Sequence, residues 1–192
     1  MLEDHKGFLW IAVNKMIARL SPDLQELKVF DKDDGLQDGD YSNEAAFFSP
    51  TGTMYFGGSR GLSYFNPDKV QTNQKAVKVY LTGMQLYNQM LQPQLGTVLD
   101  SSLMVKRHLI LPHNHRELVF EFTGINYTNP NKNIYAYTIE NLQTEWIYTD
   151  ADNRIANYFQ IPPGNYTLLV KAANSSGVWD ETPAQLKITV LP

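Results

Sequence analysis

The feature that most constrains the fold of this chain is an internal repeat with an offset of 45 residues. The segment Gly-Phe-Leu-Trp-Ile-Ala-Val at 7–13 is echoed by Gly-Thr-Met-Tyr-Phe-Gly-Gly at 52–58, and the match continues without a gap to the Pro-Asp pairs at 22–23 and 67–68. Each copy is typical of a strand, a tight turn and a second strand. Short strands repeating every ~40–45 residues are the signature of β-propeller blades. Residues 1–70 therefore predict part of a β-propeller.

The repeat also predicts which residues join the blades. Trp10 and its equivalent Tyr55 are expected to fill the space between neighbouring blades. Gly57 and Gly58 suit a crowded inner strand. A hairpin turn with positive φ is expected at Gly61, although Met16 occupies that place in the first copy.

Two copies cannot close a propeller, which needs at least about four blades. Residues 1–70 are therefore expected to be the last one or two blades of a longer, incomplete propeller. Tyr41 lies in the polar segment 38–43 and is the aromatic side chain most expected to be exposed to a ligand, with Tyr64 as a further candidate. An uncovered blade face predicts that the isolated chain self-associates.

From residue 76 onward the pattern changes to longer runs of alternating apolar and polar residues, for example 77–82, 118–123, 135–140 and 166–172. Such alternation predicts half-buried antiparallel strands. About seven strands separated by turns indicate a β-sandwich of the immunoglobulin or fibronectin-III type. The chain is thus predicted to be all-β, with propeller repeats at 1–70, a linker at 71–75 and a sandwich at 76–192.

Aromatic residues of the sandwich have expected places. Pro163-Gly-Asn-Tyr166 resembles a tyrosine corner, in which a phenol bonds the backbone near a turn. The strand tyrosines are expected to pack in the core. Trp146 and Trp179 are expected in the core or in a dimer interface.

Composition excludes several classes of protein. The 192 residues include no cysteine, so disulfides, thiolate metal sites and cysteine nucleophiles are absent. The net charge of −4 argues against contact with nucleic acid. No apolar run reaches the roughly 18 residues of a membrane span, and the polar first six residues lack the apolar core of a signal peptide.

The acidic stretch at 31–35 begins like a calcium loop. An EF-hand loop needs glycine at its sixth position and glutamate at its twelfth. Counted from Asp31, Gly35 is fifth and Ser42 is twelfth, so a solvated turn is expected instead.

Other candidate chemistry is equally incomplete. His113 and His115 could share a metal, but Glu117 is the only candidate for a third ligand nearby. Glu121 and Glu140 are expected to face solvent rather than to form the carboxylate pair of a glycosidase. The sequence contains no phosphate loop and no nucleophile elbow. No catalytic residue, cofactor or metal is therefore predicted.

The order of these motifs resembles the periplasmic sensor region of hybrid two-component regulators of Bacteroides-type gut bacteria. Those regions carry repeats close to G-x-L-W-I-G-T and then a Y_Y_Y domain, named for its tyrosines. The matching positions in the repeats are Trp10, Tyr55, Gly57, Gly58, Gly61, Phe65 and Pro67. The matching positions in the sandwich are Tyr127, Pro130, Tyr135, Tyr137, Trp146, Tyr158, Pro163, Gly164, Tyr166, Asn174, Gly177 and Trp179. Ala12, Val13, Met16 and Asn141 depart from the family pattern, and asparagine tolerates the left-handed backbone expected at 141.

This resemblance implies a function. The parent protein would be a sensor histidine kinase and response regulator of the inner membrane, continuing past Pro192 into a transmembrane helix, a kinase, a receiver and a DNA-binding domain. The periplasmic part would sense glycan fragments, with an oligosaccharide bound only by the complete propeller. The sandwich would form a homodimer next to the membrane and transmit a change in dimer geometry, without catalysis of its own.

Two other readings stay open. The chain could be part of a carbohydrate-active enzyme in which a sandwich follows a catalytic propeller, but no convergent carboxylates are evident. It could also be an accessory or adhesion module of the fibronectin-III type, which would not account for the repeat of 45 residues.

Overall fold

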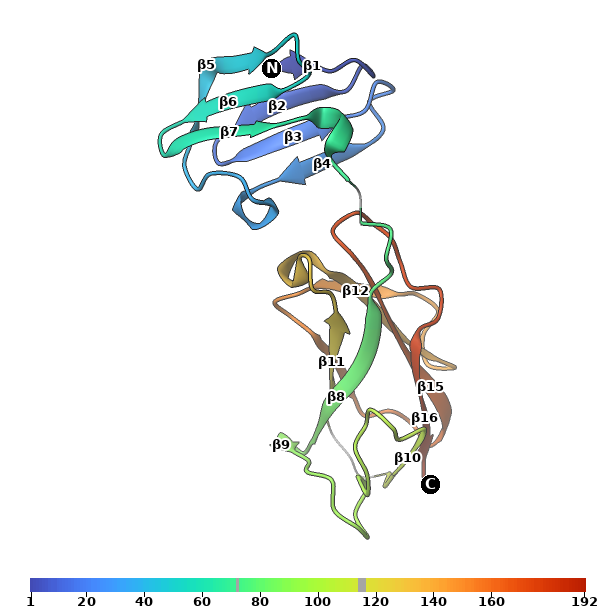
Figure 1. Cartoon of the computed structure of the whole chain (residues 1–192). Coiled ribbons are helices and arrows are strands. Elements are labelled where there is room, and N and C mark those ends of the chain that lie inside the picture. Colours follow the sequence, from blue (N-terminus) through green and yellow to red (C-terminus); the bar gives the residue numbers. More distant parts are fainter. Residues whose placement is uncertain (72, 114–116) are drawn as a thin grey trace. The chain divides into compact units, whose positions relative to one another are not determined.

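The structure, a computed structural model, describes residues 1–71, 73–113 and 117–192. The chain folds as two compact units, Met1–Thr72 and Asn73–Pro192 (Figure 1). The described residues contain strands and three short 3₁₀ turns but no α-helix, as the sequence predicts. No described segment forms an apolar helix long enough to cross a membrane.

The first unit contains two antiparallel sheets. The first sheet has the strand order β1-β2-β3-β4, with bounds β1 (Leu2–Glu3), β2 (Leu9–Val13), β3 (Met16–Leu20) and β4 (Leu27–Phe30). The second sheet has the order β5-β6-β7, with bounds β5 (Tyr41–Phe48), β6 (Met54–Gly58) and β7 (Gly61–Phe65). Short 3₁₀ turns follow each sheet at Lys32–Asp34 and Pro67–Lys69. Each copy of the repeat thus forms one sheet, as expected for consecutive blades, and the sheets do not close into a barrel.

The core of this unit lies where the two sheets pack together. It is built from Trp10 and Ile17 of the first sheet and from Tyr41, Met54 and Phe56 of the second. Trp10 stacks on Phe30 of its own sheet at 5.6 Å between ring centroids and meets Phe65 of the second sheet at 4.9 Å. The predicted place of Trp10 between neighbouring sheets is confirmed.

The two hairpins turn differently. In the second hairpin Gly61 has a φ of +130°, which confirms the predicted positive φ. In the first hairpin the left-handed residue is Asn14, with a φ of +51°, and Met16 begins β3. The repeat had placed the turn residue at Met16. Asparagine supplies the positive φ instead, because its short polar side chain tolerates that region.

Gly58 is small for a reason other than crowding between blades. A Cβ atom there would lie 2.1 Å from the Gln37 side chain and 2.8 Å from the Asp40 carbonyl oxygen. The segment before β5 is therefore packed onto the β6–β7 hairpin, and Ser59 N–H donates to the Asp40 carbonyl at 2.8 Å.

The second unit is a sandwich of two sheets. One has the order β10-β16-β15-β12-β13, with bounds β10 (His108–Leu111), β12 (Ile134–Glu140), β13 (Ile147–Asp150), β15 (Gly164–Ala173) and β16 (Ala184–Val190). The other has the order β14-β11-β8-β9, with bounds β8 (Lys78–Leu86), β9 (Gln89–Met90), β11 (Glu117–Ile125) and β14 (Ile155–Phe159). A 3₁₀ turn at Pro130–Lys132 precedes β12.

The inward residues of both sheets form one apolar core. The largest fully buried side chains there include Phe120, Phe122, Tyr135 and Ile139. The predicted alternation is therefore confirmed in the long strands. The predicted antiparallel sandwich is confirmed, with one exception at an edge, where β10 pairs with β16 in parallel.

Residues at the start of the second unit are bound to the sandwich. The Asn174 side-chain amide donates to the carbonyl oxygens of Asn73 and Lys75 at 2.6 and 2.9 Å. Val77 then forms a bridge with Ala172. The last three residues of the expected linker are thus held by specific hydrogen bonds.

Candidate functional site

Tyr41, the expected ligand contact of the repeats, is buried. Only 7% of its surface is exposed, and its ring meets Phe56 edge-on at 6.4 Å. Its hydroxyl is 2.6 Å from Ser63 Oγ in a buried hydrogen bond. The expectation of exposure was wrong, because the Tyr41 side chain packs on Phe56 and Ser63 of the neighbouring strands although the residues that flank it are polar.

Tyr55 lies elsewhere than its equivalent Trp10. It sits on the face of the second sheet opposite Met54 and Phe56, in a row with Phe47 and Tyr64. It therefore does not fill the space between the two described sheets, and its packing against a further blade stays a prediction. The rings of this row stack at 6.3 and 6.1 Å between centroids.

Trp10 is held by polar contacts at its rim. The Asp4 carboxylate accepts from the indole Nε1–H at 2.9 Å and from the backbone N–H of Phe8 at 3.0 Å. The Arg19 guanidinium carbon lies 4.8 Å from the Phe8 ring centroid and 5.8 Å from that of Trp10. These contacts satisfy the one polar group of the indole, so this cluster is structural.

The most distinctive surface of the sandwich surrounds Lys171. Its ammonium nitrogen lies 4.3 Å from the ring centroid of Trp146 and 5.1 Å from that of Trp179. Tyr148 meets Trp179 edge-on at 5.9 Å. We call Trp146, Tyr148, Lys171 and Trp179 the indole–lysine surface.

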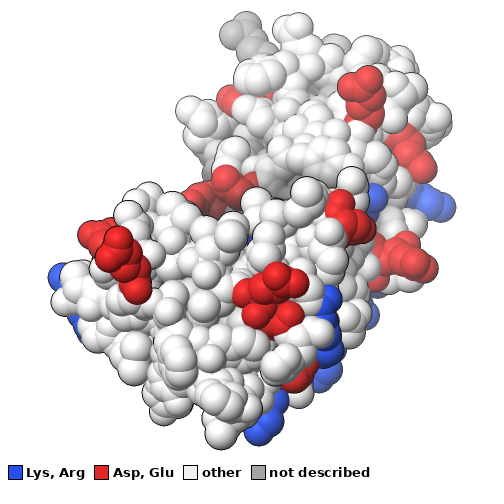
Figure 2. Space-filling view, turned by 90° about the horizontal axis from the view of Figure 1, so that it is seen from above, with Lys and Arg blue, Asp and Glu red and all other residues white. Residues whose placement is uncertain are grey.

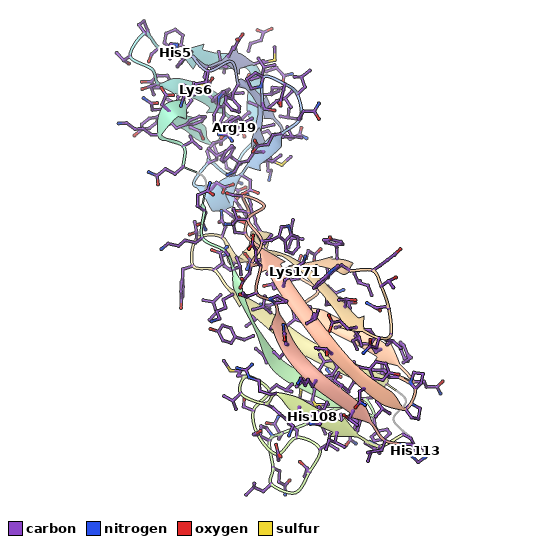
Figure 3. All side chains as sticks on the ribbon, turned by 90° about the vertical axis from the view of Figure 1, so that its right-hand side faces the viewer. His5, Lys6, Arg19, His108, His113 and Lys171 are labelled. Atoms are coloured by element: carbon purple, nitrogen blue, oxygen red, sulfur yellow. The ribbon has the colours of Figure 1, made fainter. Side chains whose placement is uncertain are left out.

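Strand register brings these residues to the outer face of the five-stranded sheet. Ala136 of β12 pairs with Tyr148 on one side and with Lys171 on the other, so all three share one row. Lys171 projects from β15 on this face (Figure 3). Trp179 is brought alongside by its bridge to Ala173.

The two tryptophans are therefore not in the core, and their alternative place in a dimer interface stays a prediction. Both are half-buried, whereas Tyr148 is 63% exposed. Their place follows from β15, where alternate residues point outward. The apolar stem of Lys171 and the small side chain of Ala136 leave room for the indoles on that outer side. A cation between two indole faces is attracted by both ring quadrupoles.

The phenols of Tyr166 and Tyr135 each make a hydrogen bond to the backbone. The Tyr166 hydroxyl donates to the Pro162 carbonyl oxygen at 3.0 Å, which confirms the tyrosine corner. The Tyr135 hydroxyl accepts from the backbone N–H of Gly124 at 3.0 Å. Gly164 enters the corner with a φ of +159°.

Tyr137 and Tyr158 form an edge-on pair at 6.1 Å in the core. Burial raises the pKa of both phenols, and the nearby Tyr137 raises that of Tyr158 further. The Tyr158 hydroxyl is buried without a hydrogen-bond partner among the described residues. Both side chains remain neutral at physiological pH and belong to the core.

Of the other motif residues, some lie in turns and one, Tyr127, is exposed to solvent. Asn174 is fully buried and Gly177 has a φ of +76° in the turn after it. Asn141 has a φ of +68°, as its tolerance of the left-handed region predicts. Tyr127, in contrast, is 95% exposed, so this tyrosine does not pack in the core.

The acidic turn at 31–35 needs no cation to explain it. The Asp31 carboxylate accepts from Asp33 N–H at 2.9 Å, and the Asp34 carboxylate accepts from Asp31 N–H at 3.0 Å. The pair caps the 3₁₀ turn, and Gly35 ends it with a φ of +92°. The Asp31 and Asp34 side chains therefore accept hydrogen bonds from backbone N–H groups of this turn.

The remaining metal and carboxylate candidates do not converge. Among the described residues, no three acidic or histidine side chains are placed to hold a metal ion. His115 lies outside the described residues, while Glu117 accepts from the Asn157 amide at 3.0 Å. Glu121 and Glu140 lie in different sheets of the sandwich.

One open cleft of about 470 Å³ lies between the edges of β8 and β16. Its apolar floor includes Leu81 and Leu103, and its rim carries Lys78, Arg107 and Lys187. These basic side chains are exposed, and no buried polar group points into the cleft from the described lining residues. Elsewhere, charged groups lie scattered over a mostly uncharged surface on the face shown in Figure 2.

Comparison with protein families concerns the second unit. The Y_Y_Y domain family matches residues 126–191, which span β12 to β16. This segment is therefore similar to a Y_Y_Y domain. Within it, the phenols of Tyr135 and Tyr166 make the hydrogen bonds described above.

Similarity extends over the whole chain. The histidine kinase P4 of Formosa agariphila is 31% identical over 194 residues, a match that covers 100% of this chain and 14% of that protein. Among solved structures, the extracellular domain of a hybrid two-component system of B. thetaiotaomicron, BT3049, superposes with a TM-score of 0.79 at 23% identity. That match covers 100% of this chain and 26% of the other.

A second extracellular domain from B. thetaiotaomicron, BT4673, matches with a TM-score of 0.57 at 19% identity, over 100% of this chain and 30% of the other. It is described in one structure as part of a one-component system and in another as part of a hybrid two-component system. These likenesses confirm the all-β fold. The solved structures that the chain resembles are extracellular domains, and the chain spans only a small part of these relatives.

Proposed function

We propose that this chain is the extracytoplasmic signal-transmission segment of a hybrid sensor histidine kinase. The observation that carries the proposal is the match over the whole chain, in sequence to a histidine kinase and in fold to an extracellular sensor domain. Both matches cover 100% of this chain. In the proposed parent protein, this segment lies in the periplasm and leads into the inner membrane.

A glycan fragment is the proposed stimulus, detected by the complete propeller rather than by these residues alone. Tyr41 and Trp10 are buried and hydrogen-bonded, so neither of these rings is open to a ligand in the described repeats. The segment would respond to binding elsewhere. A ligand can bias the module only by binding one of its conformations more tightly than the other.

A homodimer of the Y_Y_Y domain is the proposed means of transmission. The indole–lysine surface supports it, because protein interfaces are enriched in tryptophan and tyrosine and in partly exposed rings with a polar handle. Tyr148 is largely exposed at the edge of this surface. Two copies brought together there would couple the outer sheets of the two sandwiches.

The proposal is tested in the parent kinase. Tyr148→Glu and Trp179→Ala should abolish the response of a reporter gene to the inducing glycan, while Tyr127→Glu, an exposed residue of the same domain, should leave it intact. Loss of the response without loss of protein in the membrane is the expected result. A reporter that responds normally after the whole segment is deleted would overturn the proposal and favour an accessory module.

A further inference from the structure

The cleft between β8 and β16 is bounded by two strands whose edges are open over part of their length. β9 pairs with β8 at Gln85 and Leu86, so no described strand lies beside the β8 edge from 78 to 83. β10 pairs with β16 from Lys187 onward, so no described strand lies beside the first residues of β16 either. Both walls of the cleft belong to the sandwich.

Backbone groups of β8 point toward this open edge. Along a strand, the N–H and C=O groups of one residue point to one side and those of the next residue point to the other. Phe122 of β11 donates its N–H to a carbonyl oxygen just before β14 at 3.1 Å, so Phe122 faces away from β8. The next residue, Thr123, therefore faces β8, where it pairs with Tyr80. The backbone groups of Val79 and Leu81 consequently face the open edge, and no described residue forms a hydrogen bond with them.

The cleft combines an apolar floor with a basic rim. Lys78, Arg107 and Lys187 lie at the rim, and no carboxylate is among the described lining residues. None of these three side chains forms an ion pair with a described residue. The floor includes Leu81 and Leu103, which belong to the sandwich core. A basic cleft in a chain whose net charge is −4 indicates that the cleft suits an anionic partner.

An extended peptide segment matches these features together. An open strand edge binds a further strand through backbone hydrogen bonds, and alternate side chains of that strand point to opposite faces. One set of side chains would lie on the apolar floor, and the other would lie beside the basic rim. A second copy of this chain matches the edge poorly, because two β8 edges in contact would bring two basic rims together.

We infer that this cleft binds an extended acidic segment of a partner protein, which adds as a strand to the β8 edge. The backbone of the segment pairs with Val79 and Leu81. Its apolar side chains lie on the floor of the cleft, and its carboxylates lie at the basic rim. No residue of the indole–lysine surface lines the cleft, so this inference is independent of the proposed dimer.

The test is the binding of a synthetic peptide to the 192-residue chain, measured by fluorescence anisotropy. The probe is an acetylated, fluorescein-labelled peptide in which valine and glutamate alternate, and saturable binding is expected. Peptide residues opposite Val79 and Leu81 share their inward face, so the valine N–H groups are the ones that face β8.

Two control peptides separate charge from strand pairing. One carries lysine in place of glutamate, and the other carries N-methyl groups on the valine amides. The first loses the attraction to the rim, and the second loses the donors of the backbone ladder. Each should bind about tenfold more weakly than the probe, or weaker still.

Charge reversal in the chain locates the site. Lys78→Glu/Lys187→Glu should weaken binding of the probe by about tenfold or more, since like charges then face each other. Arg60→Glu/Lys69→Glu makes the same change in net charge at two exposed residues of the first unit and should bind the probe like the wild type. Circular dichroism reports whether each variant keeps its sheets.

Hydrogen exchange measured by NMR shows how the probe is held. The amides of Val79 and Leu81 should exchange more slowly in the complex than in the free chain. Unchanged exchange there, equal binding of the N-methylated peptide, or full binding by Lys78→Glu/Lys187→Glu would overturn the inference. A wild type that ignores the probe would overturn it too, and binding to phosphatidylglycerol vesicles in its place would assign the basic rim to a lipid surface.

Discussion

The phenol oxygen of Tyr135 lies 3.0 Å from the backbone nitrogen of Gly124 and accepts its hydrogen bond across the sandwich core. Gly124 belongs to β11 and Tyr135 to β12, so this bond joins the two sheets. A Cβ atom on Gly124 would lie 3.2 Å from this hydroxyl and 2.5 Å from Val77 Cγ1. Tyr135, Val77 and Gly124 are therefore packed tightly against one another.

Tyr135→Phe should lower the free energy of unfolding by about 1–3 kcal/mol, because it leaves a buried N–H group without its acceptor. Tyr158→Phe is the matched control. Its hydroxyl has no partner among the described residues, so its removal should change stability by less than about 0.5 kcal/mol or should stabilise the sandwich. Urea denaturation followed by circular dichroism measures both. Equal losses in the two variants would contradict the assignment of these hydroxyls.

Stability should fall at alkaline pH because of the buried phenols. Burial raises the pKa of Tyr137 and Tyr158 in the folded chain above the ordinary value of 10.0. Above pH 10 the unfolded chain therefore releases these protons before the folded chain does. The free energy of unfolding is then lost as the pH rises, whereas below pH 10 these two groups contribute no slope.

Denaturation at a series of pH values from 8 to about 11.5 measures this slope. Tyr158→Phe should make the decline above pH 10 shallower, since one buried ionisable group is removed. Tyr127→Phe is the control, because Tyr127 is exposed and its removal should leave the slope as it is. A decline that is unchanged in Tyr158→Phe would refute the role given to its burial.

Asn174→Ala should lower the free energy of unfolding by about 2–4 kcal/mol, since its buried amide makes several backbone hydrogen bonds. Its oxygen accepts from the N–H groups of Ser176 and Val178 at 2.8 and 3.1 Å, and its nitrogen donates to Asn73 and Lys75. Asn174→Asp keeps the acceptor and loses the two donations. Limited proteolysis near residue 74 should therefore speed up in both variants, and a cleavage rate like that of the wild type in Asn174→Asp would show that the donated bonds do not hold this segment.

Lys171→Met should lower the free energy of unfolding of the sandwich by about 0.5–2 kcal/mol, because it keeps an apolar stem of similar length and removes the cation between the indoles. Near-ultraviolet circular dichroism should also lose intensity as Trp146 and Trp179 become less constrained. Lys78→Met is the control, since Lys78 is exposed and no ring contact involves it among the described residues. The two variants behaving alike would count against the indole–lysine contact.

The repeat and the alternation of apolar and polar residues predicted much of the fold. The offset of 45 residues predicted two similar sheets and placed Trp10 between them, because a repeated sequence that forms a hairpin once will form it again. Alternation along β8, β11, β12 and β15 predicted their inward residues, since successive side chains of a strand point to opposite faces. Asn14 escaped notice because the sequence match had pointed to Met16 for the same turn.

The solvent exposure of the aromatic side chains was the property that the sequence predicted least well. Tyr41 stands among polar residues and is buried, because its strand meets Phe56 and Ser63 from elsewhere in the sheet. Trp146 and Trp179 are among the largest apolar side chains and lie outside the core, because strand register sets them beside Lys171 on the outer face.

The sequence by itself determined the class of each unit and the family that part of the second unit resembles, since these depend on spacing and on motifs along the chain. Only the tertiary structure decided which aromatic rings are buried and which strand edges stay open. It also placed Tyr135 against Gly124 and brought Lys171 between two indoles. These relationships depend on which strands become neighbours, and the burial of one side chain is set by atoms that lie far from it in the sequence.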